Sequence, residues 1–474
     1  MKLLKRKSWI CWLICVLFLW TNLFCGQNET PQKVYASSEV DLYEQIDQYL
    51  FDVTKKANFP SLSITIVDKS QTLLSKTYGV CDNVDTPYFL GSVSKSFTAL
   101  AIMQLVEERK IDLNAKISTY LTDAHDGDHI TVLQLLNHTS GLGEHQNLKN
   151  YQIVGKQNQH CYANVNYSLL GKIIESASGL TYESYMTQHI FTPLSMDKTA
   201  ATIEKAKENG VLEGYENWFG NYVKTEPKFP QNEKTWISVP AGYLSSSTSD
   251  LGKYLQMYLN RGKGIISKES IQQMFYQNVP VKAKIPYQYG MGWTLIEEPL
   301  KEPALRHAGL VETGMSVICI LPERDIGFAM TMNGNDYFVG KDMMDRIDWG
   351  VVLMLLGEKP NQIGEQEYFS RHLLYNSLYL IVFCLSILPF CFLIFSRREE
   401  SKKRGRKILF LIFYHFLFPT ILLLLPQLCF ATPLWVVKAF VPDLFFTILV
   451  SSCLLFLGGI IKGGKIIREH RKNA

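Results

Sequence analysis

Ser92 and Lys95 have the residue types and the spacing of an activated nucleophile. They lie in the run Tyr88-Phe-Leu-Gly-Ser-Val-Ser-Lys-Ser-Phe-Thr-Ala99, where an apolar helix is predicted to begin. Residues three apart share one face of a helix, so the Ser92 hydroxyl and the Lys95 amine should lie side by side. A serine becomes a good nucleophile when a neighbouring base takes its proton. A lysine can be that base when burial or nearby charge lowers its pKa.

The Ser-x-x-Lys spacing is a weak signal by itself, because it recurs in this chain. Ser195-Met-Asp-Lys198 has the same pattern in a segment predicted to be a loop after Pro193. An arbitrary match is more often a solvent-facing helix surface than a catalytic pair. Further motifs must therefore support the interpretation.

Tyr162-Ala-Asn164 is the second candidate motif. It stands just before a predicted helix, and this placement distinguishes it from the Tyr-x-Asn triplets that begin at Tyr215, Tyr258 and Tyr276. A tyrosine beside a lysine cation can relay protons, and we expect the charge to pull its pKa down. Asn164 can donate to a substrate carbonyl and fix the lysine.

His307-Ala-Gly309 is the third candidate motif and opens a predicted strand, with Glu312-Thr-Gly314 as the competing triplet. A substrate carboxylate would be repelled by Glu312 and accepted by His307. Glycine at position 309 lets a ligand backbone approach closely. A lone histidine is usually a packed or surface residue, so His307 gains its weight from following the other two motifs in order.

The elements that must position these motifs come from both ends of residues 37–357. Segments 61–67 and 72–79 predict a β-hairpin, and segments 288–297, 307–321 and 326–332 predict further strands. Residues 110–260 are predicted to be mainly helical, with loops at 138–142 and 216–236, and a helix over about 337–356 closes the region. Strands from both ends around a helical middle predict an α+β domain, an antiparallel sheet flanked by helices with an inserted helical lobe.

Three apolar segments, 373–395, 408–428 and 444–461, each approach or exceed the roughly 20 residues needed to cross a bilayer. Basic runs lie at 397–407 and 462–472, whereas the connection around 433–443 has only Lys438 as a cation. The positive-inside rule therefore predicts that both basic runs are cytoplasmic and that residues 37–372 lie outside the cell. Buried core helices would explain three such segments in a row less well.

The first residues have the form of an export signal. A basic start, Met1-Lys-Leu-Leu-Lys-Arg-Lys-Ser8, precedes an apolar stretch over 9–25. Val34-Tyr-Ala36 offers a cleavage site after Ala36, but it lies far past the apolar stretch, so a cleaved signal and an uncleaved anchor both stay open. The predicted organisation is a signal peptide or anchor (1–36), an extracytoplasmic domain (37–357), a linker (358–372), three transmembrane helices (373–461) and a basic cytoplasmic tail (462–474).

Composition excludes several other classes. The net charge is +4, and the basic runs lie beside apolar segments, which predicts membrane topology rather than nucleic-acid binding. The sequence contains no Gly-rich phosphate loop, zinc-ligand cluster or internal repeat, so we predict no metal and no cofactor. Cys81, Cys161 and Cys319 are too scattered for a disulfide framework.

Taken together, the three motifs resemble those of the serine β-lactamase and penicillin-binding superfamily, and most closely its class C β-lactamase-like branch. The stretches at 89–99, 135–142, 162–171 and 240–251 match that branch as well. The resemblance covers about residues 41–356 and stops before the three C-terminal segments. The whole architecture also resembles membrane-bound peptidases that remove an N-acyl-D-asparagine cap from nonribosomal peptide prodrugs.

The resemblance implies a role for each motif. Ser92 would be the acylated nucleophile, Lys95 the base or its electrostatic support, and Tyr162 a partner in acid–base work. Asn164 would position the substrate. The backbone N–H groups of Ser92 and Leu310 would form an oxyanion hole, in which each donor lowers the barrier by about 3–4 kcal/mol.

One departure from the family pattern bears on the substrate. The β-lactamases proper carry Lys-Thr-Gly where this chain has His307-Ala308-Gly309. Histidine at this position resembles the esterase- and peptidase-like members, and a neutral imidazole holds a β-lactam carboxylate less well than an ammonium does.

We therefore expect a serine hydrolase of the bacterial cell membrane that acts on a small peptide or amide outside the cytoplasm. A D-amino-acid-specific peptidase is favoured, with cell-wall peptides or a D-amino-acid-capped product as substrates. A β-lactamase or esterase on the same site is one alternative. A sensor that binds β-lactams or peptides without turnover is the other.

Overall fold

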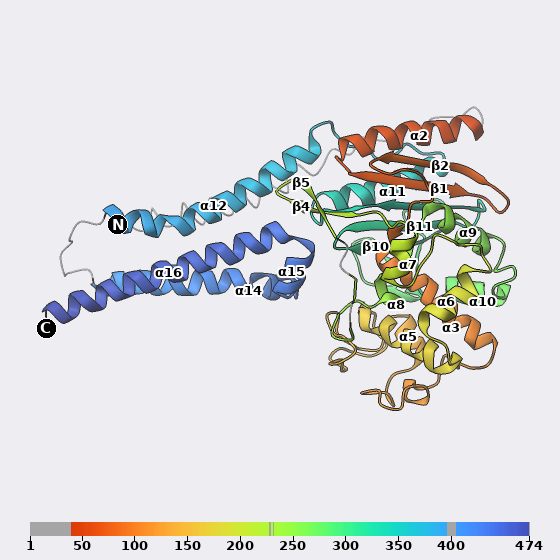
Figure 1. Cartoon of the computed structure of the whole chain (residues 1–474), viewed down its shortest axis with the longest axis horizontal. Helices are drawn as coiled ribbons and strands as arrows, with labels where there is room; N and C mark the ends of the chain where they lie inside the picture. The colour runs from red at the N-terminus through yellow and green to blue at the C-terminus, as the bar shows by residue number, and fades with distance from the viewer. Residues whose placement is uncertain (1–38, 227–228, 231, 396–403, 474) are drawn as a thin grey trace.

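An eight-stranded antiparallel sheet frames the N-terminal domain, in the order β2-β1-β12-β11-β10-β9-β8-β7 (Figure 1). The computed structural model describes residues 39–226, 229–230, 232–395 and 404–473. The strands are β1 (Ser61–Val67), β2 (Thr72–Gly79), β7 (Val279–Val281), β8 (Tyr287–Gly290), β9 (Trp293–Ile296), β10 (Ala304–Val311), β11 (Gly314–Leu321) and β12 (Ile326–Met332). Because β1 pairs with β12, both ends of the domain share one sheet, as the α+β prediction requires.

Helices cover both faces of this sheet (Figure 1). On one face, α2 (Glu39–Lys56) and α11 (Gly340–Leu355) pack on alternate strand residues such as Leu62, Ile64 and Ile66. The helical lobe packs on the other face, where Ile318 and Ile320 of β11 join its core. Every residue of β11 is buried as a result, which explains its nearly continuous apolar sequence.

The helical lobe is inserted between β2 and β7. It contains α3 (Ser94–Glu107), α4 (Val132–Leu136), α5 (Asn164–Ser178), α6 (Tyr182–Met186), α7 (Ile203–Glu208), α8 (Val239–Gly242), α9 (Thr248–Leu259) and α10 (Lys268–Tyr276). Tight turns of 3₁₀ helix lie at Gly91–Val93 and Ile117–Thr119, and a π-helical turn lies at Thr187–Phe191. Polar side chains start several helices, as Thr131 and Gln134 do in the capping box of α4.

Three expectations about strands are wrong. The predicted strand 307–321 is really β10 and β11, joined by a turn at Glu312-Thr313. The other two are wrong for a shared reason. Part of the predicted loop 216–236 is a hairpin of β4 (Gly214–Trp218) and β5 (Asn221–Thr225), and β4 also pairs in parallel with β13 (Gly334–Asn335). The predicted strand 288–297 is really β8 and β9 with a tight turn between them. Phe219-Gly220 and Met291-Gly292 form these turns with positive φ at both residues, and a large apolar residue at the first position hides the usual Asn-Gly turn signal.

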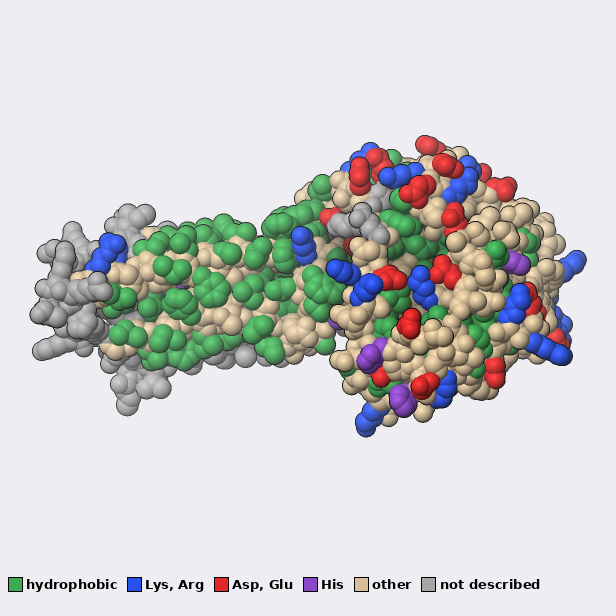
Figure 2. Space-filling model, turned by 60° about the horizontal axis from the view of Figure 1, so that its bottom comes forward, with side chains coloured by type: hydrophobic (Ala, Val, Ile, Leu, Met, Phe, Trp, Pro, Cys, Tyr) green, Lys and Arg blue, Asp and Glu red, His purple; other side chains and the backbone are tan. Residues whose placement is uncertain are grey.

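The C-terminal part is a bundle of long helices that extends away from the domain (Figure 1). It comprises α12 (Glu367–Phe395), α13 (Arg404–Ile412), a π-helical turn (Phe413–Leu417), α14 (Phe418–Phe430), α15 (Leu434–Phe440) and α16 (Pro442–Asn473). Three stretches, Glu367–Phe390, Ile408–Phe430 and Pro442–Arg468, are long and apolar enough to cross a membrane. Figure 2 shows their surface as an almost unbroken apolar band beside a charged domain surface.

The helices extend beyond the predicted apolar segments. The predicted linker 358–372 is helical from Glu367 onward, and the predicted tail is helical through Asn473. Glu367 accepts hydrogen bonds from Arg346 and Gly364, which ties the start of α12 to the domain. The predicted export signal with its cleavage site at Ala36, and most of the basic run 397–407, lie outside the described residues.

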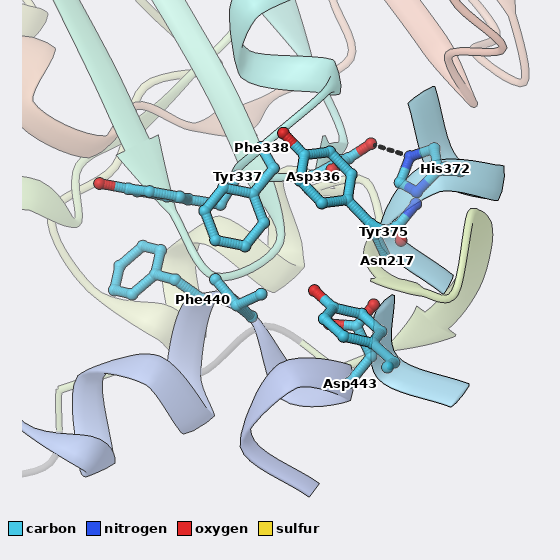
Figure 3. Close-up of a pocket in the computed structure, with 10 residues that line it drawn as sticks. Asn217, Asp336, Tyr337, Phe338, His372, Tyr375, Phe440 and Asp443 are labelled. Atoms are coloured by element: carbon cyan, nitrogen blue, oxygen red, sulfur yellow. Dashed lines mark hydrogen bonds and ion pairs between the residues drawn. The ribbon is translucent and has the colours of Figure 1, made fainter. Parts of the chain in front are cut away.

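The domain and the bundle meet in a polar junction (Figure 3). His372 of α12 pairs with Asp336 at 2.8 Å, and Asp443 of α16 accepts a hydrogen bond from the Phe219 amide at 3.1 Å. The cavity between these groups is about 10 Å³, which is room for one water molecule and not for a substrate. This junction is a structural contact between the two parts of the chain.

A short helix of the bundle also packs on the helical lobe. In α15, Val436 and Phe440 are buried in the same apolar core as the lobe. The rings of Trp435 and Phe440 lie 5.3 Å and 6.1 Å from the ring of Trp236. The loop that carries Trp236 leads directly into α8, so the bundle touches an element next to the site described below.

Candidate active site

Ser92 lies in the 3₁₀ turn Gly91–Val93, immediately before α3. Its side chain is partly exposed, whereas Gly91 and Val93 on either side are buried. Gly91 has φ +53°, a left-handed conformation that glycine adopts without strain. A Cβ at this position would lie 2.3 Å from the Leu310 nitrogen, so the turn that presents Ser92 needs glycine for space as well.

Lys95 is completely buried beneath Ser92 and contacts three oxygen atoms. Its Nζ lies 2.9 Å from Ser92 Oγ, 2.8 Å from Asn164 Oδ1 and 2.6 Å from the carbonyl oxygen of Ala241. Burial holds the pKa of Lys95 well below its ordinary value. None of the three partners is a carboxylate, so no negative charge among them favours the ammonium form.

The arrangement can orient a neutral Lys95 amine as a base. Asn164 Oδ1 and the Ala241 carbonyl can only accept hydrogen bonds, so they take the two hydrogens of a neutral amine. The nitrogen lone pair is then left facing Ser92 Oγ, from which it can accept a proton. Burial favours the neutral amine of Lys95 that can act as a base, and the hydrogen bonds to the two carbonyl oxygens orient its lone pair toward Ser92.

Tyr162 lies on the other side of Ser92, and its hydroxyl donates to Ser92 Oγ at 2.7 Å. The expectation that a neighbouring charge pulls its pKa down is wrong. Burial raises the pKa of Tyr162, and the hydrogen bond with Ser92 opposes this only in part. Lys95 Nζ lies 4.9 Å from the centre of the ring, and burial lowers the pKa of Lys95 as well, which weakens the charge that was expected to act on Tyr162.

Asn164 is the first residue of α5, two residues after Tyr162. Its Oδ1 accepts from Lys95, and its side chain is almost fully buried. The loop-to-helix junction predicted from the sequence thus brings Tyr162 and Asn164 to Ser92 and Lys95. Their catalytic roles stay predictions, whereas the distances describe a connected group.

His307 is the fourth residue of β10 rather than its first, and it is buried. Its Nδ1 lies 2.5 Å from the carbonyl oxygen of Gly292, which can only accept, so Nδ1 carries a hydrogen. Burial lowers the pKa of His307 to about 3; the bond to Gly292 opposes this shift, while Lys95 and Arg306 add to it. In the neutral ring Nε2 is an acceptor and offers a substrate carboxylate no donor, so the substrate-binding role of His307 stays a prediction.

Gly309 and Leu310 approach the Ser92 turn closely. A Cβ at Gly309 would lie 1.9 Å from the Leu90 carbonyl oxygen and 2.9 Å from the Ser92 nitrogen. Ser316 of β11 donates to the same Leu90 oxygen at 2.5 Å and fixes this approach. The backbone of β10 at Gly309 and Leu310 therefore lies against that of Gly91 and Ser92, as the predicted oxyanion hole requires.

The decoy motifs lie elsewhere. Ser195 and Lys198 are exposed in a turn, where the Lys198 amide donates to Asp250 at 2.7 Å. Glu312 accepts a hydrogen bond from the Tyr243 hydroxyl at 2.5 Å, and its side chain is buried. Among the residues that the structure describes, no group of three His, Cys, Asp or Glu side chains could hold a metal ion.

Three groups at the site had not been identified as functional from the sequence. The carbonyl groups of Ala241 and Gly292 belong to the backbone, so no residue type signals them. His138, from the stretch 135–142, packs against the Tyr162 ring at a centroid distance of 4.2 Å. Its position within a stretch that resembles the class C branch was the available signal.

The domain that carries this site is similar to known proteins. The family model described as Beta-lactamase matches residues 46–349. Protein Flp of Staphylococcus aureus (strain MW2) is 28% identical over 336 residues, which cover 64% of this chain and 65% of that protein. PbpX of Bacillus subtilis (strain 168) is 30% identical over 292 residues, which cover 56% of this chain and 70% of that protein. The chain thus spans slightly less than two thirds of the length of Flp.

A solved structure is similar as well. The octameric penicillin-binding protein homologue from Pyrococcus abyssi matches with a TM-score of 0.58 and 28% sequence identity, over 69% of this chain and 80% of that chain. The matched part corresponds in extent to the domain built on the eight-stranded sheet.

Proposed function

This chain belongs to the Beta-lactamase family, and from that premise we propose that it is a membrane-anchored serine hydrolase that acts through an acyl-enzyme on Ser92. The observation that carries the proposal is the pair of contacts to Ser92 Oγ, from Lys95 Nζ at 2.9 Å and from Tyr162 OH at 2.7 Å. The base and a second proton-carrying group are therefore each within hydrogen-bond reach of the nucleophile, as nucleophilic catalysis requires.

In the proposed reaction, Lys95 takes the Ser92 proton as Ser92 Oγ attacks the substrate carbonyl carbon. The oxyanion that forms accepts hydrogen bonds from the amides of Ser92 and Leu310. Tyr162 passes a proton to the leaving nitrogen as the carbon–nitrogen bond breaks, and the ammonium on Lys95 restores that proton. Water then releases the acyl group by the same steps in reverse order.

The chemistry of His307 narrows the proposed substrate. Its Nε2 is an acceptor, which suits a substrate N–H and leaves a carboxylate without a partner. We therefore favour an amide whose leaving group carries no carboxylate beside the scissile bond. A peptide with a D-amino acid on the acyl side fits this requirement when the scissile bond is internal, either in a D-amino-acid-capped product or in a cell-wall peptide; removal of a C-terminal residue does not fit, because that leaving group carries its carboxylate beside the bond.

The proposed location is the outer face of a bacterial cell membrane. The three stretches long and apolar enough to span a membrane support the anchor. The basic runs that flank them in the sequence support an extracytoplasmic domain under the positive-inside rule.

Substrate profiling of the purified full chain in detergent tests the proposal. The panel contains anilides of N-acyl-D-Asn and of D-Ala-D-Ala, their L isomers, nitrocefin and p-nitrophenyl esters. We expect cleavage of a D-configured amide that Ser92→Ala abolishes and that Ser195→Ala, at the second Ser-x-x-Lys, leaves unchanged. Fast Ser92-dependent nitrocefin turnover would instead assign a β-lactamase, and a stable adduct on Ser92 without turnover would assign a sensor.

A further inference from the structure

His138 is buried directly behind Tyr162. It lies in the loop after α4 with φ +54°, and its side chain has no exposed surface. The two rings have centroids 4.2 Å apart and are tilted by 35°. His138 therefore supports the face of Tyr162 while Tyr162 OH contacts Ser92.

Both residues that flank Tyr162 are hydrogen-bonded to His138. The Cys161 amide donates to the His138 carbonyl oxygen at 2.8 Å, and the Ala163 amide donates to His138 Nδ1 at 3.2 Å. Ala163 is the N-cap of α5, and its own side chain offers no capping group. The imidazole therefore accepts from the N-cap amide, as the N3 side chain does in a capping box, at the point where the chain passes from Tyr162 to Asn164.

Hydrogen bonding fixes the protonation state of His138. Asn166 Nδ2 also donates to Nδ1 at 2.9 Å, because Asn166 Oδ1 already accepts from Ser140 Oγ at 2.7 Å. With two donors directed at it, Nδ1 is an acceptor and the ring hydrogen lies on Nε2. Within the described part of the chain, His138 Nε2 has no hydrogen-bond partner. A buried donor without a partner is costly, so packing alone does not account for a histidine here.

We propose that His138 is a positioning residue of the catalytic site: its neutral imidazole binds the first turn of α5 and supports the Tyr162 ring, so that Tyr162 and Asn164 are held at Ser92 and Lys95. This role rests on the proposed function, because it acts through the geometry of those four residues. His138 Nδ1 lies 3.2 Å from the Ala163 nitrogen, and Tyr162 OH lies 2.7 Å from Ser92 Oγ. A displacement of about 1 Å at a reacting group can lower a rate by about 10²-fold.

The test measures the rate at which a fluorophosphonate phosphonylates Ser92 Oγ, with loss of fluoride, in the full chain in detergent, and the melting temperature is recorded in parallel. His138→Phe keeps a ring against Tyr162 but removes the acceptor, and we expect this labelling to be about 10²-fold slower. His138→Asn places Oδ1 where Nδ1 lies and tolerates positive φ, so it should recover most of that loss. For the amide substrate, kcat should fall while KM changes little.

His160→Ala is the matched control. Its ring lies 5.9 Å from that of His138 in the same aromatic cluster, and no hydrogen bond joins the described His160 side chain to α5. We expect Ser92 in His160→Ala to be labelled at a near-normal rate. Equal rates for His138→Phe and the unaltered protein would overturn the positioning role, and so would equal losses in His138→Phe and His138→Asn. Failure of the unaltered protein to label at Ser92 would instead overturn the proposed function, and this role with it.

Discussion

Two buried polar clusters in this molecule are built in opposite ways. At the site, Lys95 contacts only neutral oxygens, and burial lowers its pKa. At the junction between domain and bundle, His372 contacts the carboxylate of Asp336 (Figure 3). A buried base without an opposite charge is reactive, whereas a histidine paired with a carboxylate is held in place.

The two clusters also differ in access. Ser92 is partly exposed, whereas Lys95 is fully buried, so a substrate can reach the nucleophile while the base is shielded from solvent. His372 and Asp336 enclose a cavity of about 10 Å³. The cluster at Ser92 therefore suits chemistry, whereas the junction cluster holds the helix bundle to the domain. Substitutions in the first cluster should lower turnover most, and substitutions in the junction should lower it least.

Lys95→Arg should have the largest effect. Arginine keeps a cation at the position but does not give up its proton in proteins, so it cannot take the Ser92 proton. We expect turnover to fall by about 10³-fold or more, which is within the range for loss of a general base. Release of the amine from an amide substrate measures turnover, and labelling of Ser92 by a fluorophosphonate, followed by intact mass, shows whether the serine still reacts. Turnover that survives in Lys95→Arg would show that the lysine acts only by its charge.

Tyr162→Phe should have the next largest effect. The substitution removes the hydroxyl that donates to Ser92 Oγ and leaves the ring that packs on His138. We expect kcat for an amide substrate to fall by about 10²-fold, with little change in melting temperature. An activated ester should lose less than an amide, because its leaving group needs no proton. Equal losses on both substrates would contradict a role in protonating the leaving nitrogen.

Gly309→Ala tests the close approach of β10 to Ser92. An added methyl would meet the Leu90 carbonyl oxygen at 1.9 Å, so the two segments must separate. We expect turnover to fall by roughly 10-fold to 10²-fold as one oxyanion donor moves away. The free energy of unfolding should fall by about 1–3 kcal/mol, as in other overpacked sites. Gly364→Ala is the control for added bulk at glycine, because its φ is not in the left-handed region and an added methyl would meet only Glu367 at an ordinary contact distance of 3.6 Å.

Much of this site could be predicted from the sequence, because the signals were side chains at regular spacing. The Ser92–Lys95 spacing gave their proximity, and the loop-to-helix junction gave the placement of Tyr162 beside them. The carbonyl groups of Ala241 and Gly292 could not be predicted, since backbone atoms carry no residue signal. The direction of the Tyr162 pKa was wrong because burial in three dimensions outweighs the charge that the sequence suggested.

The fold shows the same limit. The hairpin of β1 and β2, the inserted lobe and the closing helix α11 follow from periodicity and turn residues. The turns at Phe219-Gly220 and Met291-Gly292 were missed because their first residues are large and apolar. Both residues lie in strand-rich segments where tertiary contacts outweigh local preference. Sequence periodicity thus predicted most helices and strands, and only the assembled structure showed at which residues the strands end.

The buried His307 makes the stability of the protein depend on pH. Burial lowers the pKa of His307 in the folded protein from its ordinary value of 6.5 to about 3. Between these values the unfolded chain binds more protons, so the free energy of unfolding should rise with pH. His307→Asn keeps a donor for Gly292 without titrating and should reduce that slope in urea titrations of the full chain. An unchanged slope would mean that His307 titrates normally in the folded protein.

His372→Asn should have the smallest effect on turnover and still lower stability. The substitution removes the partner of the buried Asp336 carboxylate, and we expect the free energy of unfolding to fall by about 1–3 kcal/mol. Turnover of the folded protein should stay within about twofold, because a buried contact in the junction does not touch the reacting atoms and contributes no transition-state interaction. Trp435→Ala removes the contact of α15 with Trp236. This substitution sharpens the comparison, because the loop that carries Trp236 leads into α8, and α8 contains the Ala241 carbonyl that Lys95 contacts. If Trp435→Ala lowers kcat while His372→Asn does not, the bundle influences catalysis through α15 alone. A loss of kcat in His372→Asn comparable to that of Tyr162→Phe would show that the two clusters act as one.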